Sequence, residues 1–481
     1  MHPILTPFEA NAGSQGQQLA AGDQSLMLEF AAFAAVAQGL AGQIRTQTNA
    51  PHVGILAPTS TAGAVAVFAC WYAGRVPVPL NFLLSPPELA KIVADAGLDL
   101  ILAVEHFAPL AGAVGARLLP LNGRTLVPGS LPAPEAAPGD LAAMIYTSGT
   151  SAEPKGVRLT FANLAENVRA CIEHAKITPD QVLLSVLPQF HSFGFTAMTV
   201  LPLMLGATVH YLPRFSPAAV VSAIHEKRAS IFMAVASMYA ALNKLKSADS
   251  TALASLKLAI SGGEPLPAAV AETFEARFGV QVNEGYGLTE TSPVVSINLP
   301  WSRKPGSVGR PLPGVEIAAI DAAGRALPAD SEGELVIRGH CVMQGYHNKA
   351  EATAAAIVDG GLRTGDIGRV DRDGFVHITG RAKEMLIIAG ENVFPREIEN
   401  VIAAHPAVAE VAVIGTKDDL RGEVPVAFVI LNEGTNATDA ELRAFCRERI
   451  APYKAPREIR IARELPRGPT GKILKRALKA D

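Results

Sequence analysis

Cysteine is scarce in this chain, and charge of one sign is not in excess. The four cysteines (Cys70, Cys171, Cys341 and Cys446) are scattered over 481 residues without paired spacing. They therefore predict neither a zinc site nor a disulfide framework, and they favour a reducing compartment, the cytoplasm. The formal net charge of −3 gives no reason to expect nucleic acid or an anionic membrane as a partner.

Signals for membrane insertion are also missing. The N-terminus, Met1–Ile4, has no basic region followed by an apolar stretch, so no signal peptide is indicated. The most apolar early run, residues 64–71, is too short to span a bilayer, so no transmembrane segment is expected. No internal repeat is present. The sequence does not indicate whether the protein touches a membrane with its surface. It also does not indicate the oligomeric state, and a homodimer is one alternative.

The chain is long enough, and apolar enough, to form more than one hydrophobic core. With 481 residues and 49% hydrophobic composition, two or more domains are expected. Residues 1 to about 25, rich in Gly, Gln and Ala, are expected to be loosely ordered. Short apolar runs and helical patterns then alternate, most clearly between residues 160 and 290, which predicts an α/β fold of mostly parallel sheets flanked by helices. The expected strands are 53–57, 182–187, 230–236, 256–260 and 280–283, and the expected helices are 62–72, 163–174, 216–227 and 265–278.

The pattern changes towards the C-terminus. Between residues 306 and 380, short apolar strands separated by turns such as Asp371–Gly374 predict a β-rich subdomain. The last hundred residues are expected to form a smaller α+β unit, with helices over 395–403 and 439–450.

One segment carries a clear chemical signal. Residues 146–156 are rich in glycine and in side chains that carry a hydroxyl, and Lys155 stands near their end. They follow an apolar run. Small residues let a loop wrap closely around an anion, and Lys155 adds a mobile positive charge, so this segment suits a polyphosphate. It is not the Walker pattern, because Gly156 follows the lysine. The alternative is a polar turn between strands.

The segment resembles the phosphate-binding loop of the adenylate-forming superfamily, which holds acyl-CoA synthetases, luciferases and peptide-synthetase adenylation domains. The family's other motifs follow in the family's order, and the resemblance covers nearly the whole chain after about residue 50. These motifs are at residues 189–194, 262–265, 285–290, 364–366, 380–383, 390–392 and 469–472.

The resemblance implies a two-step ligase. A carboxylate attacks the α-phosphate of ATP to give an acyl-adenylate and pyrophosphate, and a thiol then takes the acyl group. The nucleophile is ionised at neutral pH, so no general base is needed, and the enzyme supplies alignment and charge neutralisation. ATP, Mg²⁺ and CoA are the implied cofactors and co-substrates.

The resemblance assigns roles residue by residue. Tyr286 is expected to stack on adenine, where the alternative is an ordinary half-buried tyrosine in a turn. Thr289 is expected to reach the α-phosphate, and Glu290, with Thr150, to bind Mg²⁺. A lone Thr-Glu is more often a helix cap. The expected ATP-binding set is Thr147, Ser148, Gly149, Thr150, Ser151, Lys155, Gly262, Gly263, Glu264, Gly285, Tyr286, Gly287, Thr289, Asp366, Arg381 and Lys472.

Four further residues receive roles from the resemblance. Asp366 and Arg381 are expected at the ribose, and His191 near the substrate carboxylate. Lys472 is expected to bridge carboxylate and α-phosphate oxygens, as a mobile point charge that acts in the transition state. It could otherwise be one more solvated lysine in a basic tail. The expected catalytic residues are Lys472, His191, Thr289 and Glu290.

The second step needs a different layout, because a thiol must reach the acyl-adenylate. The family turns its C-terminal domain between the two steps, which places the hinge at Lys383. The predicted domains are therefore an N-terminal adenylation domain, 1–382, and a small mobile α+β domain, 383–481. Gly390 and Glu391 are expected beside the thiol, where Gly390 permits close backbone approach.

The acid is expected to be aliphatic, of medium or long chain. Segments 293–298 and 304–309 look most like bacterial long-chain acyl-acyl-carrier-protein synthetases, and no charged residue in 231–238 suggests recognition of an amino group. CoA is the expected thiol. An acyl carrier protein as acceptor, a stand-alone enzyme loading a carrier, an aryl-CoA ligase and a non-catalytic nucleotide-binding relative are the alternatives.

Overall fold

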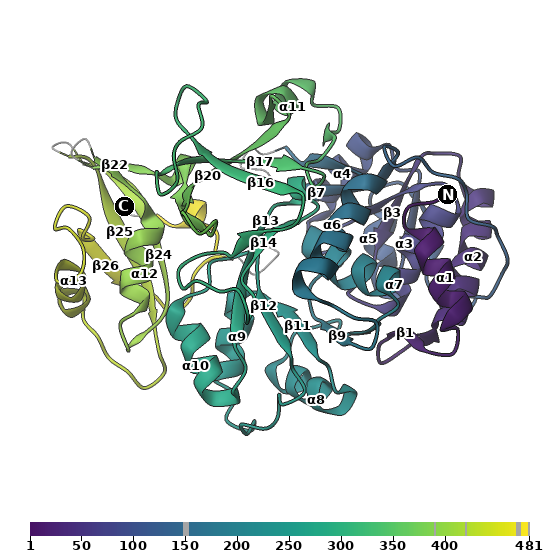
Figure 1. Cartoon of the computed structure of the whole chain (residues 1–481), viewed down its shortest axis with the longest axis horizontal. Helices are drawn as coiled ribbons and strands as arrows, with labels where there is room; N and C mark the ends of the chain where they lie inside the picture. Colours follow the sequence, from purple (N-terminus) through teal and green to yellow (C-terminus); the bar gives the residue numbers. More distant parts are fainter. Residues whose placement is uncertain (148–152, 389–390, 419–420, 468–472, 480–481) are drawn as a thin grey trace.

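The structure is a computed structural model that describes residues 1–481 except 148–152, 389–390, 419–420, 468–472 and 480–481. A larger N-terminal part holds several sheets with helices on their faces, and a smaller C-terminal part lies beside it (Figure 1). The N-terminus lies on the side of the larger part that faces away from the C-terminal part. The predicted α/β fold class is confirmed.

A nine-stranded sheet is the centre of the larger part. Its strands are β1 (Leu19–Gly22), β2 (Met27–Glu29), β9 (Val182–Ser185), β10 (Thr208–Tyr211), β11 (Ile231–Ala234), β12 (Leu258–Ser261), β13 (Val282–Gly287), β14 (Val294–Ile297) and β15 (Arg310–Pro311). Their order in space is β15-β14-β13-β12-β11-β9-β10-β1-β2. Neighbours from β13 to β1 are parallel, and the edge strands β14, β15 and β2 are antiparallel. The carboxyl ends of the parallel strands therefore meet along one edge of the sheet, where ligands usually bind.

Helices join these strands. They are α6 (Phe161–Ala175), the π-helix η2 (Phe193–Val200), α7 (Leu201–Leu205), α8 (Pro217–Lys227), α9 (Ala236–Asn243) and α10 (Ala268–Phe278). Thr160 caps the start of α6: its hydroxyl accepts a hydrogen bond from the Asn163 backbone N–H, and the Asn163 side chain accepts one from the Thr160 N–H. This reciprocal cap satisfies two backbone donors that a helix start leaves open.

A second, parallel sheet extends the larger part. It holds β3 (His52–Leu56), β4 (Val76–Pro79), β5 (Leu100–Ala103) and β6 (Arg117–Pro120) in the order β4-β3-β5-β6. Its helices are α2 (Phe30–Gln47), α3 (Thr61–Tyr72), α4 (Pro86–Ala96) and α5 (Ala108–Gly112). The alternation of strands and helices predicted from the sequence is present in both sheets, with boundaries shifted by a few residues.

The expectation of a loosely ordered N-terminus was wrong. Helix α1 (Leu5–Ser14) and strand β1 are both regular, and Leu5 and Phe8 are fully buried. The Phe8 ring lies 4.7 Å from Phe68 and 5.5 Å from Phe33, centroid to centroid. The Gly, Gln and Ala content of this segment gave no sign of its short apolar face, and long-range packing rather than helix propensity orders it.

A small antiparallel sheet carries the phosphate-loop segment. It holds β7 (Leu141–Thr147), β8 (Lys155–Thr160) and β18 (Gly345–Tyr346), and β8 pairs with both of the others. The predicted loop thus follows β7 and precedes β8, although residues 148–152 themselves lie outside the described residues.

The predicted β-rich subdomain is present. Its strands are β16 (Val315–Ile320), β17 (Gly333–Gly339), β19 (Ile357–Val358), β20 (Gly361–Val370) and β21 (Val376–Arg381), with helix α11 (Ala350–Ala356) between β18 and β19. Antiparallel pairing of β20 with β21 places Asp366 opposite Arg381. Two residues fifteen positions apart in the sequence therefore face each other.

The C-terminal part has its own sheet and core. It holds β22 (Leu386–Ile388), β23 (Glu391–Val393), β24 (Val408–Asp418), β25 (Gly422–Leu431) and β26 (Glu458–Ile461), with helices α12 (Pro395–Ala403) and α13 (Asp439–Arg447). A separate apolar cluster packs between this sheet and the helices. The predicted α+β unit is confirmed, and its boundary at residues 382 and 383 stays a prediction.

The two parts touch closely where they meet. A Cβ atom at Gly380 would lie 2.7 Å from the Phe394 ring, and Arg396 of α12 lies 3.6 Å from the carboxylate of Glu284 in β13. Among the described residues, no helix combines the length and apolarity needed to cross a membrane. All four cysteines are buried thiols.

Candidate active site

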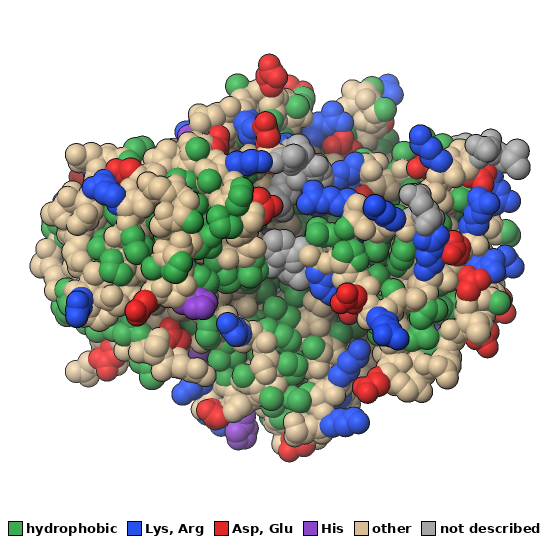
Figure 2. All heavy atoms as spheres, turned by 180° about the vertical axis from the view of Figure 1, so that it is seen from behind, with side chains coloured by type: hydrophobic (Ala, Val, Ile, Leu, Met, Phe, Trp, Pro, Cys, Tyr) green, Lys and Arg blue, Asp and Glu red, His purple; other side chains and the backbone are tan. Residues whose placement is uncertain are grey.

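A cavity of about 480 Å³ lies where the carboxyl ends of β12 and β13 meet the small antiparallel sheet and the β20–β21 pair. It has a polar end, which we define by Lys155, Tyr286, Glu290, Tyr346 and Arg381, and an uncharged apolar end. On the face shown in Figure 2 the surface is hollowed between the two parts of the molecule, and Lys and Arg side chains lie around that hollow.

Hydrogen bonds join Tyr286, Asp366 and Arg381 at the polar end. The Tyr286 hydroxyl donates to one oxygen of Asp366 at 2.5 Å, and Arg381 Nε lies 3.0 Å from the other oxygen. Asp366 is only 3% exposed, so its oxygens depend on these partners for hydrogen bonds. Burial and the Asp366 charge raise the pKa of Tyr286 well above its ordinary value, which keeps the phenol a donor. The result is a buried carboxylate held in one orientation.

A second cluster surrounds Glu290. The Tyr346 hydroxyl donates to Glu290 Oε1 at 2.8 Å, and Lys155 Nζ lies 4.9 Å from the centre of the Tyr346 ring. The neighbouring Thr289 hydroxyl lies 3.2 Å from that of Ser192. A carboxylate, a hydroxyl and a lysine thus surround the same space.

This cluster fits Mg²⁺ only if the bound substrate supplies some of the oxygen ligands. The described part of the chain has no group of three His, Cys, Asp or Glu side chains that could hold a metal ion. Mg²⁺, however, is commonly bound by one or two carboxylates together with substrate phosphates. Glu290 therefore suits Mg²⁺ that arrives with a polyphosphate, and does not suit a resident metal site.

Positive charge collects on one side of the polar end. Lys155, Arg363, Arg381 and Lys383 all line the cavity. Burial, and then the charge of Arg381, lowers the pKa of Lys383. Arg363 is paired with Glu334 and Arg381 with Asp366, which leaves Lys155 and Lys383 to face a polyanion. This concentration of cations in a half-enclosed space favours a phosphate-bearing ligand.

Two glycines are required by close packing rather than by a ligand alone. A Cβ atom at Gly287 would lie 2.0 Å from the backbone oxygen of Pro293, which no side chain tolerates. At Gly262 it would lie 3.1 Å from the Phe193 ring, so the ring would have to shift slightly to admit a side chain. These glycines let β12 and β13 reach the cavity as bare backbone.

The apolar end is built mostly from residues outside the motifs. Its lining residues come from α6, η2, β11, β12 and β14 and the segments that follow them, and none of them is charged. They are Cys171, Ala175, Ile177, Phe193, Ala197, Leu201, Met233, Ile260, Pro293, Val294 and Ile297.

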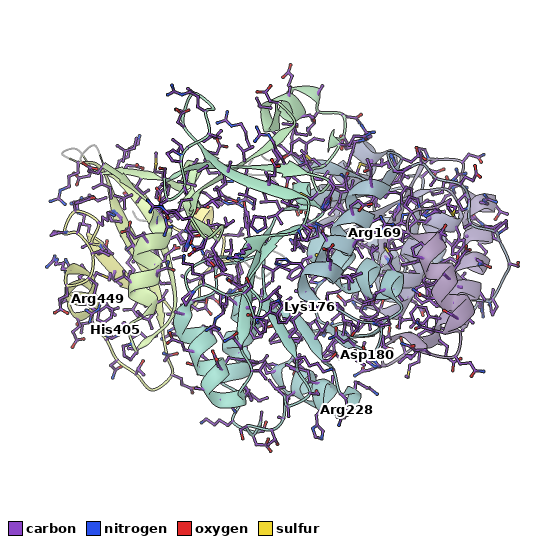
Figure 3. All side chains as sticks on the ribbon, in the orientation of Figure 1. Arg169, Lys176, Asp180, Arg228, His405 and Arg449 are labelled. Carbon is purple, nitrogen blue, oxygen red and sulfur yellow. The ribbon has the colours of Figure 1, made fainter. Side chains whose placement is uncertain are left out.

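An exposed charge lies beside the apolar end, directly after α6. Ala175 and Ile177 line the cavity, whereas Lys176 between them is exposed and places its ammonium 5.0 Å from the centre of the Trp301 ring. Figure 3 labels Lys176 at the lower end of α6. This charge therefore stays in solvent, and the lining remains apolar.

Comparison with known proteins decides the family. The AMP-binding enzyme family matches residues 8–347, and the AMP-binding enzyme C-terminal domain matches residues 397–472. The chain belongs to the AMP-binding enzyme family. The predicted family resemblance is confirmed.

Relatives of the chain are named for different acids. It is 39% identical over 343 residues to the long-chain-fatty-acid–CoA ligase of Bacillus subtilis (strain 168), covering 70% of this chain and 61% of that protein. It is 35% identical over 429 residues to a feruloyl-CoA synthase of an Amycolatopsis species, covering 88% and 87%. A Bacillus subtilis O-succinylbenzoate coenzyme A synthetase, in complex with ATP and magnesium ion, superposes with a TM-score of 0.88 at 29% identity, covering 98% of each chain.

These findings establish the reaction class. The chain is an acid–thiol ligase of the AMP-forming type, which joins an acid to CoA through an adenylate. The predicted cofactors, ATP, Mg²⁺ and CoA, are confirmed at this level. The acid itself is not decided, because the relatives differ in it.

The cavity brings together most of the predicted site residues of this AMP-binding enzyme. Those that line it are Thr147, Lys155, His191, Gly262, Gly263, Gly285, Tyr286, Gly287, Thr289, Glu290, Arg381 and Lys383. Asp366 supports this set through Tyr286 and Arg381. The predicted residues Ser148, Gly149, Thr150, Ser151, Gly390 and Lys472 lie outside the described residues.

Two predicted residues do not lie at the cavity. The Glu264 carboxylate instead accepts a hydrogen bond from the Ser237 backbone N–H at 2.6 Å, so in this structure it fastens the start of α9. Glu391 is exposed in β23, which pairs with β22 at the outer corner of the C-terminal part (Figure 1). In this arrangement of the two parts, Glu391 is therefore remote from the polar end.

Sequence reasoning missed Tyr346, Arg363 and the apolar lining. Tyr346 follows a glycine in a β-rich stretch, as Tyr286 does, and that similarity could have drawn attention to it. The apolar lining gave no such signal, because Cys171, Ala197 and Met233 are ordinary core residues in the sequence. Only the crossing of α6, η2 and the sheet brings them to one cavity.

Proposed function

We propose that this enzyme activates an aliphatic acid of medium or long chain with ATP and transfers the acyl group to CoA. The observation that supports this best is the continuity of the cavity from the cationic polar end to an apolar end without a charged side chain. An uncharged tail gains by burial in such a lining, whereas a second carboxylate or an amino group would be buried without a partner.

The polar end suits alignment of ATP. The adenine would stack on Tyr286, and the ribose hydroxyls would donate to Asp366, which can accept several hydrogen bonds while Arg381 holds it in place. Lys155, together with Lys383, would neutralise phosphate charge.

The carboxylate of the acid would enter with its tail in the apolar end, beside His191 and Thr289. Glu290, with Thr150, would hold Mg²⁺, which when bound supplies charge neutralisation at the phosphate oxygens. Lys472 would add its charge as the carboxylate oxygen attacks the α-phosphate and pyrophosphate leaves. No residue has to take a proton from the nucleophile, because the carboxylate is already ionised.

The second step would follow a rotation of the C-terminal part about Lys383. Glu391 is remote from the cavity in the present arrangement, so this arrangement does not place it beside a thiol. A rotation that brings β22 and β23 to the cavity would also carry Gly390 there. This is the role we assign to the unit over residues 383–481.

An aromatic acid is the second candidate. The feruloyl-CoA synthase relative covers more of this chain than the fatty-acid–CoA ligase does. A flat ring would also be accommodated by small side chains such as Ala175, Ala197 and Cys171. We place either reaction in the cytoplasm, where buried free thiols are stable and ATP and CoA are available.

A panel of acids and acceptors tests the proposal. Purified protein with ATP and Mg²⁺ is supplied with decanoate, hexadecanoate or ferulate, and with CoA or a holo-carrier protein side by side. Pyrophosphate release and the mass of the thioester are measured. We expect acyl-CoA, AMP and pyrophosphate from the aliphatic acids.

Each other outcome selects one alternative. Turnover of ferulate alone would replace the aliphatic acid by the aromatic one. Pyrophosphate release with thioester only on the carrier protein would replace CoA by that protein. A protein that binds ATP and turns over none of the acids would be a non-catalytic relative.

A further inference from the structure

Tyr346 contacts both charged groups proposed to act on the phosphates. Its hydroxyl donates to Glu290 Oε1 at 2.8 Å, and its ring lies 4.9 Å from Lys155 Nζ, centroid to nitrogen. The side chain lines the cavity, whereas its backbone belongs to β18, which pairs with β8 next to the predicted phosphate loop. One residue thus connects the carboxylate and the lysine across the polar end.

Backbone hydrogen bonds fix this residue on both sides. The Met343 N–H donates to the Glu290 backbone oxygen at 2.9 Å, and the His347 N–H donates to the Gly156 oxygen at 2.8 Å. The Tyr346 N–H donates to the Thr353 hydroxyl at 2.9 Å. Tyr346 is therefore tied to the chain beside Glu290 and to the chain beside Lys155, so its side chain has little freedom to move away from either.

Tyr346 is the donor in this pair, because its hydroxyl carries the proton and the Glu290 carboxylate oxygen accepts the hydrogen bond. A donor on one carboxylate oxygen fixes the plane of the carboxylate and leaves the second oxygen for a hard cation. The ring face attracts the Lys155 ammonium without cancelling its charge, as a carboxylate would.

We propose that Tyr346 is a positioning residue for adenylate formation: its hydroxyl orients Glu290 for Mg²⁺, and its ring holds Lys155 towards the phosphates. The proposal rests on the ATP-dependent step described above. The hydroxyl and the ring of Tyr346 make different contacts, so different substitutions can remove them one at a time.

Tyr346→Phe removes the hydroxyl and keeps the ring. ATP binding is measured by isothermal titration calorimetry with and without Mg²⁺. We expect the gain in ATP affinity that Mg²⁺ provides to fall by about tenfold, as for the loss of one charge-assisted hydrogen bond, with affinity in the absence of Mg²⁺ unchanged. Tyr346→Leu should weaken ATP binding in both titrations, because it also removes the ring beneath Lys155.

A matched control exists in the same chain. The Tyr72 hydroxyl donates to a Glu9 carboxylate oxygen at 3.1 Å, and neither residue lines the cavity. Tyr72→Phe removes the same kind of hydrogen bond and should leave both titrations unchanged. Thermal unfolding of all three variants shows whether each is folded, and thioester formation from supplied acyl-adenylate should persist in each.

The outcomes separate this inference from the proposed function. If wild-type protein forms acyl-AMP and Tyr346→Phe binds ATP like wild type in both titrations, the inference is wrong and the proposed function stands. Equal loss of affinity with and without Mg²⁺ would also overturn it, since the hydroxyl would not act through Glu290. A wild-type protein that forms no acyl-AMP overturns both.

Discussion

The two ends of the cavity are held together by different forces. At the polar end, Tyr286, Asp366 and Arg381 are joined by hydrogen bonds at 2.5 and 3.0 Å, and Tyr346 joins Glu290 in the same way. At the apolar end, residues such as Cys171, Ala197 and Met233 line the cavity with side chains that carry no charge. Hydrogen bonds are directional and demand particular side chains, whereas apolar packing accepts many combinations of similar volume.

This difference matches the way the relatives vary. The long-chain-fatty-acid–CoA ligase and the feruloyl-CoA synthase are named for different acids, yet both align with this chain at 35% identity or more. If relatives share the polar end but differ in the side chains that line the apolar end, the same reaction can act on many acids. Substitutions at the polar end should therefore act on all acids alike, and substitutions at the apolar end should discriminate between them.

The largest effect is expected from Lys472→Ala, at a residue outside the described part of the chain. Adenylate formation should fall by orders of magnitude for every acid, because a charge that acts mainly in the transition state is lost. ATP–pyrophosphate exchange with two acids of different length measures this. Thioester formation from supplied acyl-adenylate should survive. Lys479→Ala, an exposed lysine of the same basic tail, is the control and should have no effect.

A strong effect that is also independent of the acid is expected at the hinge. Lys383 lies in the short turn η4 (Ala382–Glu384) between β21 and β22. Lys383→Pro fixes φ and should trap one arrangement, so one half-reaction is retained and the other strongly reduced. Lys383→Ala should be mild. A folded Lys383→Pro variant that runs both half-reactions at normal rates would contradict the assignment of the hinge.

An effect that depends on the acid is expected at Ala197, which lines the apolar end and is 3% exposed. Ala197→Phe should fill this end and lower kcat/KM for hexadecanoate by about 100-fold, within the range by which apolar pockets discriminate between acids. Turnover of butanoate and the KM for ATP should change little, and they control for misfolding. An equal loss for both acids would break the distinction between the two ends.

The smallest effect concerns Glu284, a buried acid of β13 beside Arg396 that does not line the cavity. Burial raises the pKa of its carboxyl to about 7, although the Arg396 charge acts in the opposite direction. The folded protein then binds a proton more tightly than the unfolded chain. Stability should therefore be lost as pH rises from about 4.5 to about 7, the interval between the two pKa values.

Glu284→Gln should remove this dependence. Thermal unfolding between pH 5 and 8 should show a falling midpoint for wild-type protein that is absent from the variant. ATP affinity should stay the same in both, because Glu284 lies behind the polar end rather than in it. A wild-type midpoint that rises through this interval would show that the Arg396 charge outweighs burial.

Much of the fold could be predicted because it follows from short patterns. Helix α12 begins and ends at the predicted residues, Pro395 and Ala403, since its apolar spacing and its initial proline are both local signals. Helix α1 could not be predicted, because Phe8 is buried by Phe33 and Phe68, which lie in other helices. Local sequence patterns do not indicate contacts between residues that are distant in the sequence.

The sequence by itself determined the chemistry of the polar end. Tyr286, Glu290, Asp366 and Arg381 stand in recognisable motifs, because directional hydrogen bonds and phosphate charge permit few substitutes. Only the tertiary structure decided the shape of the apolar end, the support of Glu290 by Tyr346, and the placement of Glu264 and Glu391 away from the cavity. Each of these depends on the packing of distant elements, and van der Waals packing constrains volume and shape rather than residue type.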